Sequence, residues 1–228
     1  MNAALVVGDL SFKVRSSTRR RTMQITVERD GTLTMLAPPR CQREQLERFA
    51  RAKRRWVYEK LALKEMLPRP VRKEHLSGEG FPYLGRTYRL RLVAGDGPPL
   101  RLHEGFFKLR RKDASSGEHQ FSVWYSDHAR PWLETRVAGW ARRLNLSPTA
   151  VTVRNQGFRW ASCGADGRLY FHWKVIQLPP RLIDYVIVHE LAHLTHEHHG
   201  RSFWAAVSRV MPDYEGRRSE LLSFGAGL

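Results

Sequence analysis

The sequence is poor in cysteine and lacks long hydrophobic runs. Its 228 residues include only two cysteines, Cys41 and Cys163, so it has no disulfide framework of the kind that small secreted proteins use. No apolar stretch approaches the ~20 residues that a membrane-spanning helix needs. The short apolar stretch at residues 3–7 also lacks the basic segment that precedes it in a secretory signal. The sequence therefore predicts a cytoplasmic protein without a membrane partner.

Acidic residues are also scarce, with 22 Asp and Glu against 39 Lys and Arg and a formal net charge of +17. An excess of positive charge attracts polyanions, and nucleic acid is a common polyanion inside cells. The alternative explanation is an arginine-rich surface that is merely solvated. Seven Trp and ten Phe argue against disorder, because such large apolar groups need a core to pack in. The charge thus indicates a possible nucleic-acid partner, and nothing in the sequence indicates the oligomeric state.

The first 66 residues predict a basic β/α region. Hydrophobic residues alternate over residues 10–15, 23–27 and 32–36, which favours a small antiparallel sheet. The period then changes to that of a helix over residues 42–66, with Lys and Arg between the apolar positions. We expect this amphipathic helix to be broken once, and to be followed by a weak linker at residues 67–85.

The remainder predicts an α+β fold in which a mostly antiparallel sheet packs on a helix. We expect a strand-rich region over residues 81–130, with a hairpin at 81–93 and two or three strands within 100–125. A third region, residues 132–228, is expected to begin with a helix at 132–144. Three short strands are expected to follow it, at residues 151–153, 158–160 and 168–173. We treat residues 1–228 as a single domain that comprises these three regions.

A metal-binding spacing occurs on the next expected helix, which begins after Pro179 and Pro180 and runs through residues 182–197. His189, Glu190 and His193 form an H-E-x-x-H pattern. Two imidazoles four residues apart lie on one helix face and can converge on one zinc ion at about 2.0–2.1 Å. Glu190 beside them can take a proton from a water that the metal activates. Burying these groups among apolar neighbours would be costly without such a purpose.

A catalytic zinc needs a third protein ligand and one open position. On a straight helix His196 would lie about 10 Å along the axis from His189, which is too far for one ion. The third ligand should therefore follow the end of the helix, where Gly200 permits a left-handed terminus. The spacing leaves four candidates open: the neighbours His198 and His199, and more distantly Glu215 and Glu220.

The sequence around these residues resembles the YgjP-like metallopeptidases, which are relatives of the WLM and SprT-like zinc peptidases. The resemblance rests on RWASC at residues 159–163, IDYVIVHELAHLTHEHHGRSFW at 183–204 and MPDY at 211–214, and it extends over roughly residues 10–222. The family pattern H-E-x-x-H-x5-H implies His199 as the third ligand. Ala161 is a departure, because the family usually has glycine there, but it touches no ligand.

The resemblance implies a zinc metallopeptidase that hydrolyses peptide bonds of a peptide or protein substrate. One Zn²⁺ per chain would be held by His189, His193 and His199, with Glu190 as the catalytic general base. His172 and Arg159 are candidates for a second group that stabilises the oxyanion. Two alternatives are a nucleic-acid-associated protein with a structural zinc and a protease that is recruited to its substrates by DNA.

Overall fold

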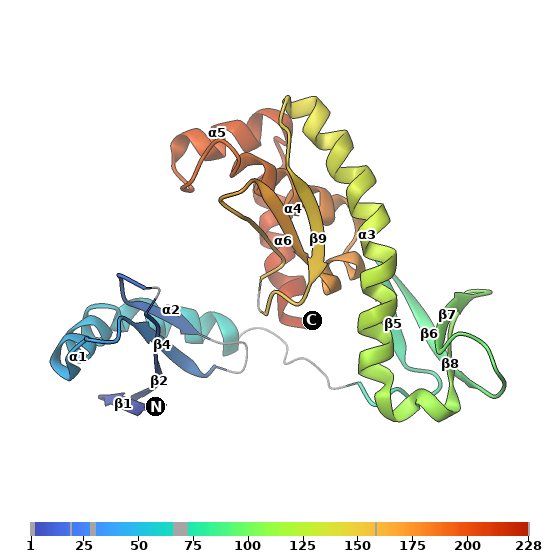
Figure 1. Ribbon diagram of the computed structural model, residues 1–228, viewed down its shortest axis with the longest axis horizontal. Helices are drawn as coiled ribbons and strands as arrows, with labels where there is room; N and C mark the ends of the chain where they lie inside the picture. Colours follow the sequence, from blue (N-terminus) through green and yellow to red (C-terminus); the bar gives the residue numbers. More distant parts are fainter. Residues whose placement is uncertain (1–2, 19, 28–30, 66–72, 158, 228) are drawn as a thin grey trace. The chain divides into compact units, whose positions relative to one another are not determined.

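The computed structural model describes residues 3–18, 20–27, 31–65, 73–157 and 159–227 (Figure 1). The chain divides into two compact units, residues 1–70 and residues 71–226. The division falls within the weak linker that the sequence indicates at residues 67–85. The prediction that residues 1–228 act as one domain stays a prediction.

The first unit contains a four-stranded sheet in the order β1-β2-β4-β3. Its strands are β1 (Ala3–Val7), β2 (Leu10–Ser16), β3 (Gln24–Val27) and β4 (Leu33–Ala37). The two outer pairings are antiparallel, whereas β2 and β4 pair in parallel. The prediction of an all-antiparallel sheet is therefore wrong at its central pairing, because β3 lies outside β4 and leaves β4 beside β2.

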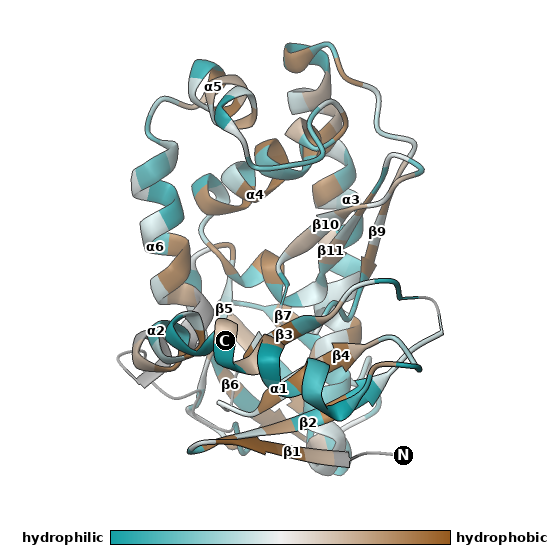
Figure 2. Cartoon of the chain, turned by 90° about the vertical axis from the view of Figure 1, so that its left-hand side faces the viewer, coloured by the Kyte–Doolittle hydropathy of each residue, from teal (hydrophilic) through white to brown (hydrophobic). Residues whose placement is uncertain are grey.

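Two helices complete the core of this unit, α1 (Arg43–Ala52) and α2 (Arg54–Glu65). The predicted helix over residues 42–66 is thus broken once, at Lys53. Ala50 of α1 and Val57 of α2 are buried in one apolar cluster with Phe12 of β2 and Met35 of β4. Figure 2 shows the hydrophobic colouring of β1 and the hydrophilic patches on α1. Each helix therefore uses its apolar face for the core and leaves its basic face outside.

The described residues of the second unit form two separate sheets. The strands of the first, ordered β5-β6-β8-β7, are β5 (Gly80–Tyr83), β6 (Arg86–Val93), β7 (Leu100–His103) and β8 (Phe106–Arg110). The strands of the second, ordered β10-β11-β9, are β9 (Ala150–Arg154), β10 (Ala161–Cys163) and β11 (Arg168–His172). Each sheet has one parallel pairing, β6 with β8 and β9 with β11. The α+β prediction is confirmed, but the chain forms several mixed sheets.

The β5–β6 hairpin, which the sequence predicts, packs against the segment that leads into the H-E-x-x-H helix. Its turn places Leu84 and Gly85 at positive φ, and the Leu84 amide donates to the Ile176 carbonyl at 2.8 Å. A Cβ atom at Gly85 would lie 2.8 Å from the Cα of Pro179. Only glycine therefore suits both the backbone conformation and the close approach at this position.

A single long helix, α3 (Gly117–Leu144), occupies residues where the sequence predicts a strand and a polar loop. The predicted strands within residues 100–125 are confirmed only as far as β8, and the short 3₁₀ helix η1 (Arg111–Ser116) then leads into α3. The predicted helix at residues 132–144 is the second half of α3, which continues through Pro131. Helix α3 therefore runs across the predicted boundary between the strand-rich region, residues 81–130, and the third region, residues 132–228.

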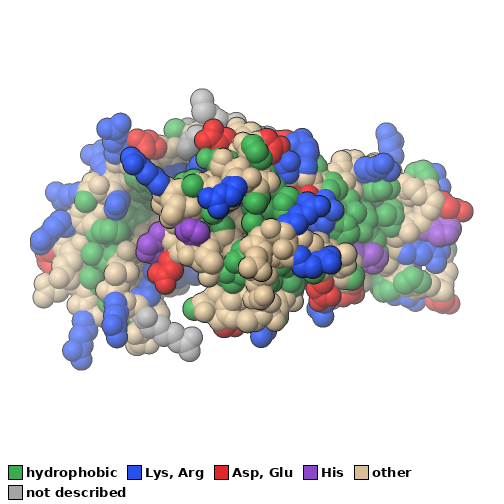
Figure 3. Space-filling view, turned by 90° about the horizontal axis from the view of Figure 1, so that it is seen from above, with side chains coloured by type: hydrophobic (Ala, Val, Ile, Leu, Met, Phe, Trp, Pro, Cys, Tyr) green, Lys and Arg blue, Asp and Glu red, His purple; other side chains and the backbone are tan. Residues whose placement is uncertain are grey.

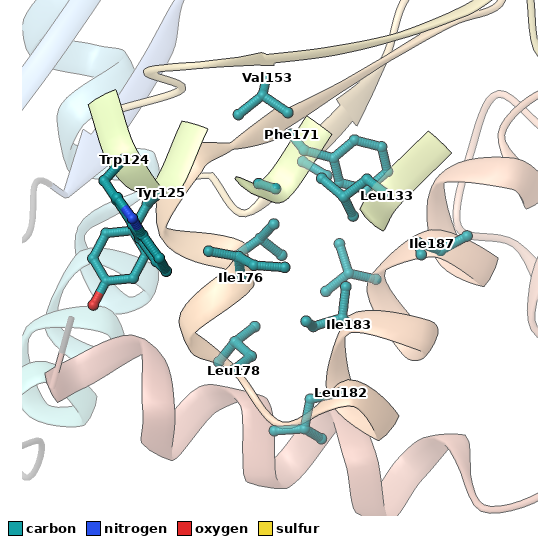
Figure 4. Packing of buried hydrophobic residues seen from close by; sticks show 14 of the residues in the cluster. Trp124, Tyr125, Leu133, Val153, Phe171, Ile176, Leu178, Leu182, Ile183 and Ile187 are labelled. Carbon is teal, nitrogen blue, oxygen red and sulfur yellow. The ribbon is translucent and has the colours of Figure 1, made fainter. Parts of the chain in front are cut away.

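The C-terminal elements of the second unit are η2 (Trp173–Gln177), α4 (Pro180–Ala192), α5 (Arg201–Val210) and α6 (Tyr214–Gly227). Ile183 and Ile187 of α4 lie in one buried cluster with Leu133 of α3 and Phe171 of β11 (Figure 4). This cluster also includes Phe107 of β8. One continuous core therefore joins both sheets of the unit to α3 and α4.

Within the described residues, no helix is both long enough and apolar enough to cross a membrane.

Lys and Arg side chains are spread across the face shown in Figure 3, among fewer acidic ones.

Candidate metal centre

The H-E-x-x-H residues lie at the C-terminal end of the largely buried helix α4, with His193 as its C-cap. Pro180 occupies its first turn, where proline is tolerated. Asp184 of α4, itself buried, accepts two 2.7 Å hydrogen bonds from the Arg136 guanidinium of α3. The Trp140 indole donates a third at 2.9 Å. This bidentate ion pair fixes α4 on α3 and with it the direction in which His189 points.

The helix ends earlier than the sequence predicts. Its last residue is Ala192, and His193 is the C-cap. The His196 amide still donates to the Ala192 carbonyl at 3.0 Å, but the chain then turns toward α5, whose N-cap is Gly200. Gly200 has φ −78°, so the expected left-handed helix terminus at this glycine is wrong. The segment from His193 to Gly200 is a loop that returns the chain to the imidazoles.

This loop brings His199 against His189 of α4 and against His193, the C-cap of that helix. The Nε2 atom of His199 lies 2.9 Å from Nε2 of His189 and 3.2 Å from Nε2 of His193. Nitrogens from all three rings lie within 4.8 Å of one another. The three imidazoles therefore converge on one point.

The other candidate ligands lie elsewhere. Among the described residues, the grouping suited to a metal contains His189, His193 and His199, and not His198. Glu220 forms a bidentate ion pair with Arg181, and Glu215 accepts from the Tyr214 hydroxyl. His196 contributes its carbonyl, which is 2.9 Å from Nδ1 of His193.

The electrostatic environment favours neutral imidazoles and a protonatable carboxyl. Burial, together with the neighbouring rings and Arg218, lowers the pKa of His189 to about 3. Burial and the His193 ring likewise lower the pKa of His199. Burial raises the pKa of Glu190 to about 7, against the opposing effects of the Cys163 amide and of Arg159. Neutral imidazole is the form that binds a metal, and a carboxyl with a pKa near neutrality can both accept and release a proton.

A cleft of about 490 Å³ opens at this cluster. It is lined by residues 161–165, which comprise β10 and the turn after it, and by Arg159, His189, Glu190, His193, Glu197 and His199. Glu190 is 7% exposed, and its carboxylate accepts a hydrogen bond from the backbone amide of Cys163. The three imidazoles and the carboxylate thus face a common space that a ligand can enter.

The sequence that forms this cluster also matches a known family. The family model "YgjP-like, metallopeptidase domain" matches residues 21–224. The chain belongs to the YgjP-like metallopeptidase family. The resemblance stated from the sequence is confirmed, and the match extends over both compact units.

The other comparisons add one partial structural likeness for this YgjP-like chain. A solved structure, that of the metallopeptidase zymogen of Pyrococcus abyssi abylysin, shares 23% sequence identity with it. The match covers 40% of this chain and 91% of that one, with a TM-score of 0.37. No curated protein matches the sequence.

The structure separates the two residues considered as second oxyanion donors. His172 is buried, its Nδ1 accepts a hydrogen bond from the Lys174 amide at 3.0 Å, and it is absent from the lining of the cleft. Arg159 is exposed and lines the cleft together with Glu190. Of the two, Arg159 alone is positioned to contact a ligand in the cleft of the YgjP-like domain.

Sequence reasoning missed several groups around the site. The Cys163 amide that contacts Glu190 carries no signal of its own in the sequence. Glu197 lies in the cleft because of the loop after α4, which the sequence assigns to the helix. The ring of Trp204 stacks on His199 at 5.7 Å between centroids and on Tyr214 at 5.2 Å. The F-W and M-P-D-Y segments of the resemblance were the available signal for these aromatic contacts.

Proposed function

We propose that this YgjP-like chain is a zinc-dependent metallopeptidase that hydrolyses peptide bonds in a peptide or protein substrate. One observation carries the proposal: three imidazoles converge beside a buried carboxylate that stands outside their grouping, and all four line one cleft. The proposal assigns His189, His193 and His199 as metal ligands and Glu190 as the general base.

The three imidazoles fit a zinc ion. Nitrogens bound tetrahedrally at 2.0–2.1 Å lie about 3.3 Å from each other, close to the 2.9 and 3.2 Å separations of the Nε2 atoms. The His196 carbonyl beside Nδ1 of His193 favours a proton on that nitrogen and leaves Nε2 free as a ligand. When bound, zinc supplies Lewis acidity that polarises a carbonyl and lowers the pKa of water. We expect one Zn²⁺ per chain.

Glu190 has the environment of a proton carrier. Its carboxylate accepts a hydrogen bond from the Cys163 amide. Because Glu190 is otherwise buried, few other groups can exchange a proton with it. A carboxyl that takes a proton from water can also deliver it to the departing amine. One residue thereby serves both attack and leaving-group departure.

The surroundings of the cleft suit an extended peptide. Strand β10 stands at the end of its sheet and, among the described residues, pairs only with β11. An extended substrate can add to such an edge through backbone hydrogen bonds. The Arg159 guanidinium, on the approach to β10, can then stabilise negative charge that develops on the carbonyl oxygen.

A purely structural zinc fits this arrangement less well. Structural sites close four positions with protein ligands, whereas the grouping within the described residues provides three. The three imidazoles also line the same cleft as Glu190.

Metal analysis combined with a peptide-library assay tests the proposal. We expect elemental analysis of the metal-replete protein to give about one zinc per chain, and mass spectrometry to detect cleaved library peptides. Cleavage should stop on chelation and return on addition of zinc. Protein that retains no transition metal would contradict the zinc site, and zinc-loaded protein that cleaves no member of a broad library would contradict the peptidase.

A further inference from the structure

Helix α2 carries an exposed tryptophan between two exposed lysines. Lys53, the residue just before α2, is followed by Trp56 and Lys60 at spacings of three and four residues, each close to one helical turn. Trp56 is 39% exposed and is one of the few large apolar side chains on the described surface. We call Lys53, Trp56 and Lys60 the α2 stripe.

Within the part of the chain that the structure describes, the positive charges of the α2 stripe have no ion-pair partner. Among the described residues, no carboxylate forms an ion pair with Lys53 or Lys60, whereas the adjacent Arg54 and Arg55 pair with Asp9 and Glu59. Residues 1–70 carry 16 Lys and Arg against 7 Asp and Glu. The two lysines are therefore free to bind an anion, within a unit whose net charge attracts one.

The apolar face of α2 is already occupied. Val57 is fully buried, and Tyr58 and Leu61 pack against the same core under the sheet of the first unit. An amphipathic helix that binds a membrane must insert its apolar face into the lipid boundary. This face of α2 packs in the core of the first unit and cannot insert into lipid. The surface of α2 that a partner can contact is the exposed indole of Trp56 with the two lysines beside it.

We propose that the α2 stripe binds single-stranded nucleic acid. The flat indole of Trp56 stacks on an unpaired base, and the ammonium groups of Lys53 and Lys60, on backbone positions about 10 Å apart along the helix, neutralise phosphates on either side. A duplex stacks its bases on each other and offers an indole no free base face. This surface lies wholly in residues 1–70, so the inference does not depend on the proposed peptidase activity.

Fluorescence anisotropy of the full chain with a labelled oligothymidine strand tests this proposal. We expect binding at low salt that weakens steeply as salt rises, because phosphate contacts release counterions. Lys53→Glu with Lys60→Glu should flatten that salt dependence by about 1.4 in the log–log slope. The matched control is Arg86→Glu with Arg89→Glu, which makes the same charge change at two exposed arginines of β6.

The aromatic contact has its own pair of variants. Trp56→Ala should weaken binding by about 5- to 150-fold, the range for loss of one base stack, while Trp56→Phe should retain most of the affinity. Thermal unfolding of each variant checks that the exposed substitutions leave the fold intact. These variants should leave zinc content unchanged.

Four outcomes would overturn the proposal. The first is absence of binding at low salt, and the second is equal weakening by the β6 control, which would attribute binding to net charge alone. The third is equal affinity of the Trp56→Ala and wild-type proteins. The fourth is vesicles of anionic lipid or duplex DNA binding as tightly as the single strand, with the same dependence on the α2 stripe.

Discussion

The two compact units of this chain differ in where their acidic side chains lie. In residues 73–227, Asp184 and Glu190 are buried on α4 inside a large apolar cluster. In residues 3–65, the buried cluster is apolar and the ionised groups stay outside, where Arg43 and Glu47 are typical. Burying a charge costs free energy unless it is paired or serves a reaction. The contrast therefore marks the unit in which chemistry is expected.

The ion pairs of the two units differ in the same way. Arg136 and Asp184 are 48 positions apart and join two helices through a bidentate contact. Arg43 and Glu47 are four residues apart on one exposed helix face. A pair of the first kind fixes tertiary structure, whereas a pair of the second kind contributes little. The predictions below test this contrast, beginning with the metal cluster.

The largest effect is expected from His199→Ala. Removing one of three proposed ligands should weaken zinc binding by more than about 100-fold, since even indirect partners of a ligand cost 10- to 100-fold. Peptide cleavage should be lost with the metal. Zinc content by elemental analysis, with cleavage measured in parallel, provides the readout.

His198→Ala and His196→Ala are the matched controls for this variant. Both should retain zinc, because His198 stands outside the cluster and His196 contributes a backbone carbonyl. An empty site in His198→Ala together with a filled one in His199→Ala would show that the third ligand is misassigned.

Glu190→Gln should separate chemistry from metal binding. The amide keeps the size of the side chain but cannot take a proton from water, so cleavage should fall by about 10²- to 10⁴-fold. Zinc content and thermal stability should match those of the wild-type protein. Loss of zinc in this variant would instead make Glu190 part of the metal-binding structure, and unchanged cleavage would refute its role as a base.

The smallest effects concern the two ion pairs. Asp184→Asn keeps the shape of the side chain but removes the charge that Arg136 contacts, and it should lower the free energy of unfolding by about 1–2 kcal/mol. Glu47→Ala on α1 should change it by less than about 0.5 kcal/mol. Denaturant unfolding monitored by circular dichroism measures both.

Equal costs for Asp184→Asn and Glu47→Ala would remove the distinction between a tertiary and a local ion pair. A selective loss of zinc affinity in Asp184→Asn would strengthen the distinction. The Arg136–Asp184 ion pair would then position His189 as well as stabilise α4.

Local patterns predicted many elements correctly but failed where tertiary packing overrides them. The β5–β6 hairpin and the break between α1 and α2 follow from short-range periodicity and turn residues. Helix α3 was missed over its first half because its buried residues there include the aromatic Phe121, Trp124 and Tyr125, a residue type that favours strands. Their spacing is nevertheless that of a helix, and Glu118, Asp127 and His128 lie on its exposed face. The parallel pairings were missed because pairing order depends on contacts far apart in the sequence.

The candidate site was predicted unevenly for the same reason. His189, Glu190 and His193 follow from helical spacing, which is local. The residue spacing alone left His198 and His199 open, since neighbours in a loop differ only in the direction the loop gives them. The contact between the Cys163 amide and Glu190 joins a strand to a helix 27 positions later, and no local pattern encodes it.

The sequence by itself determined the basic charge, the H-E-x-x-H spacing and membership of a metallopeptidase family, because composition and short-range order are properties of the chain alone. The tertiary structure decided where α4 stops, how the loop after it returns His199 to the other two imidazoles, and which residues share the cleft with Glu190. Those features depend on the free energy of packing segments that are distant in sequence. That free energy is set by the whole core and not by any single motif.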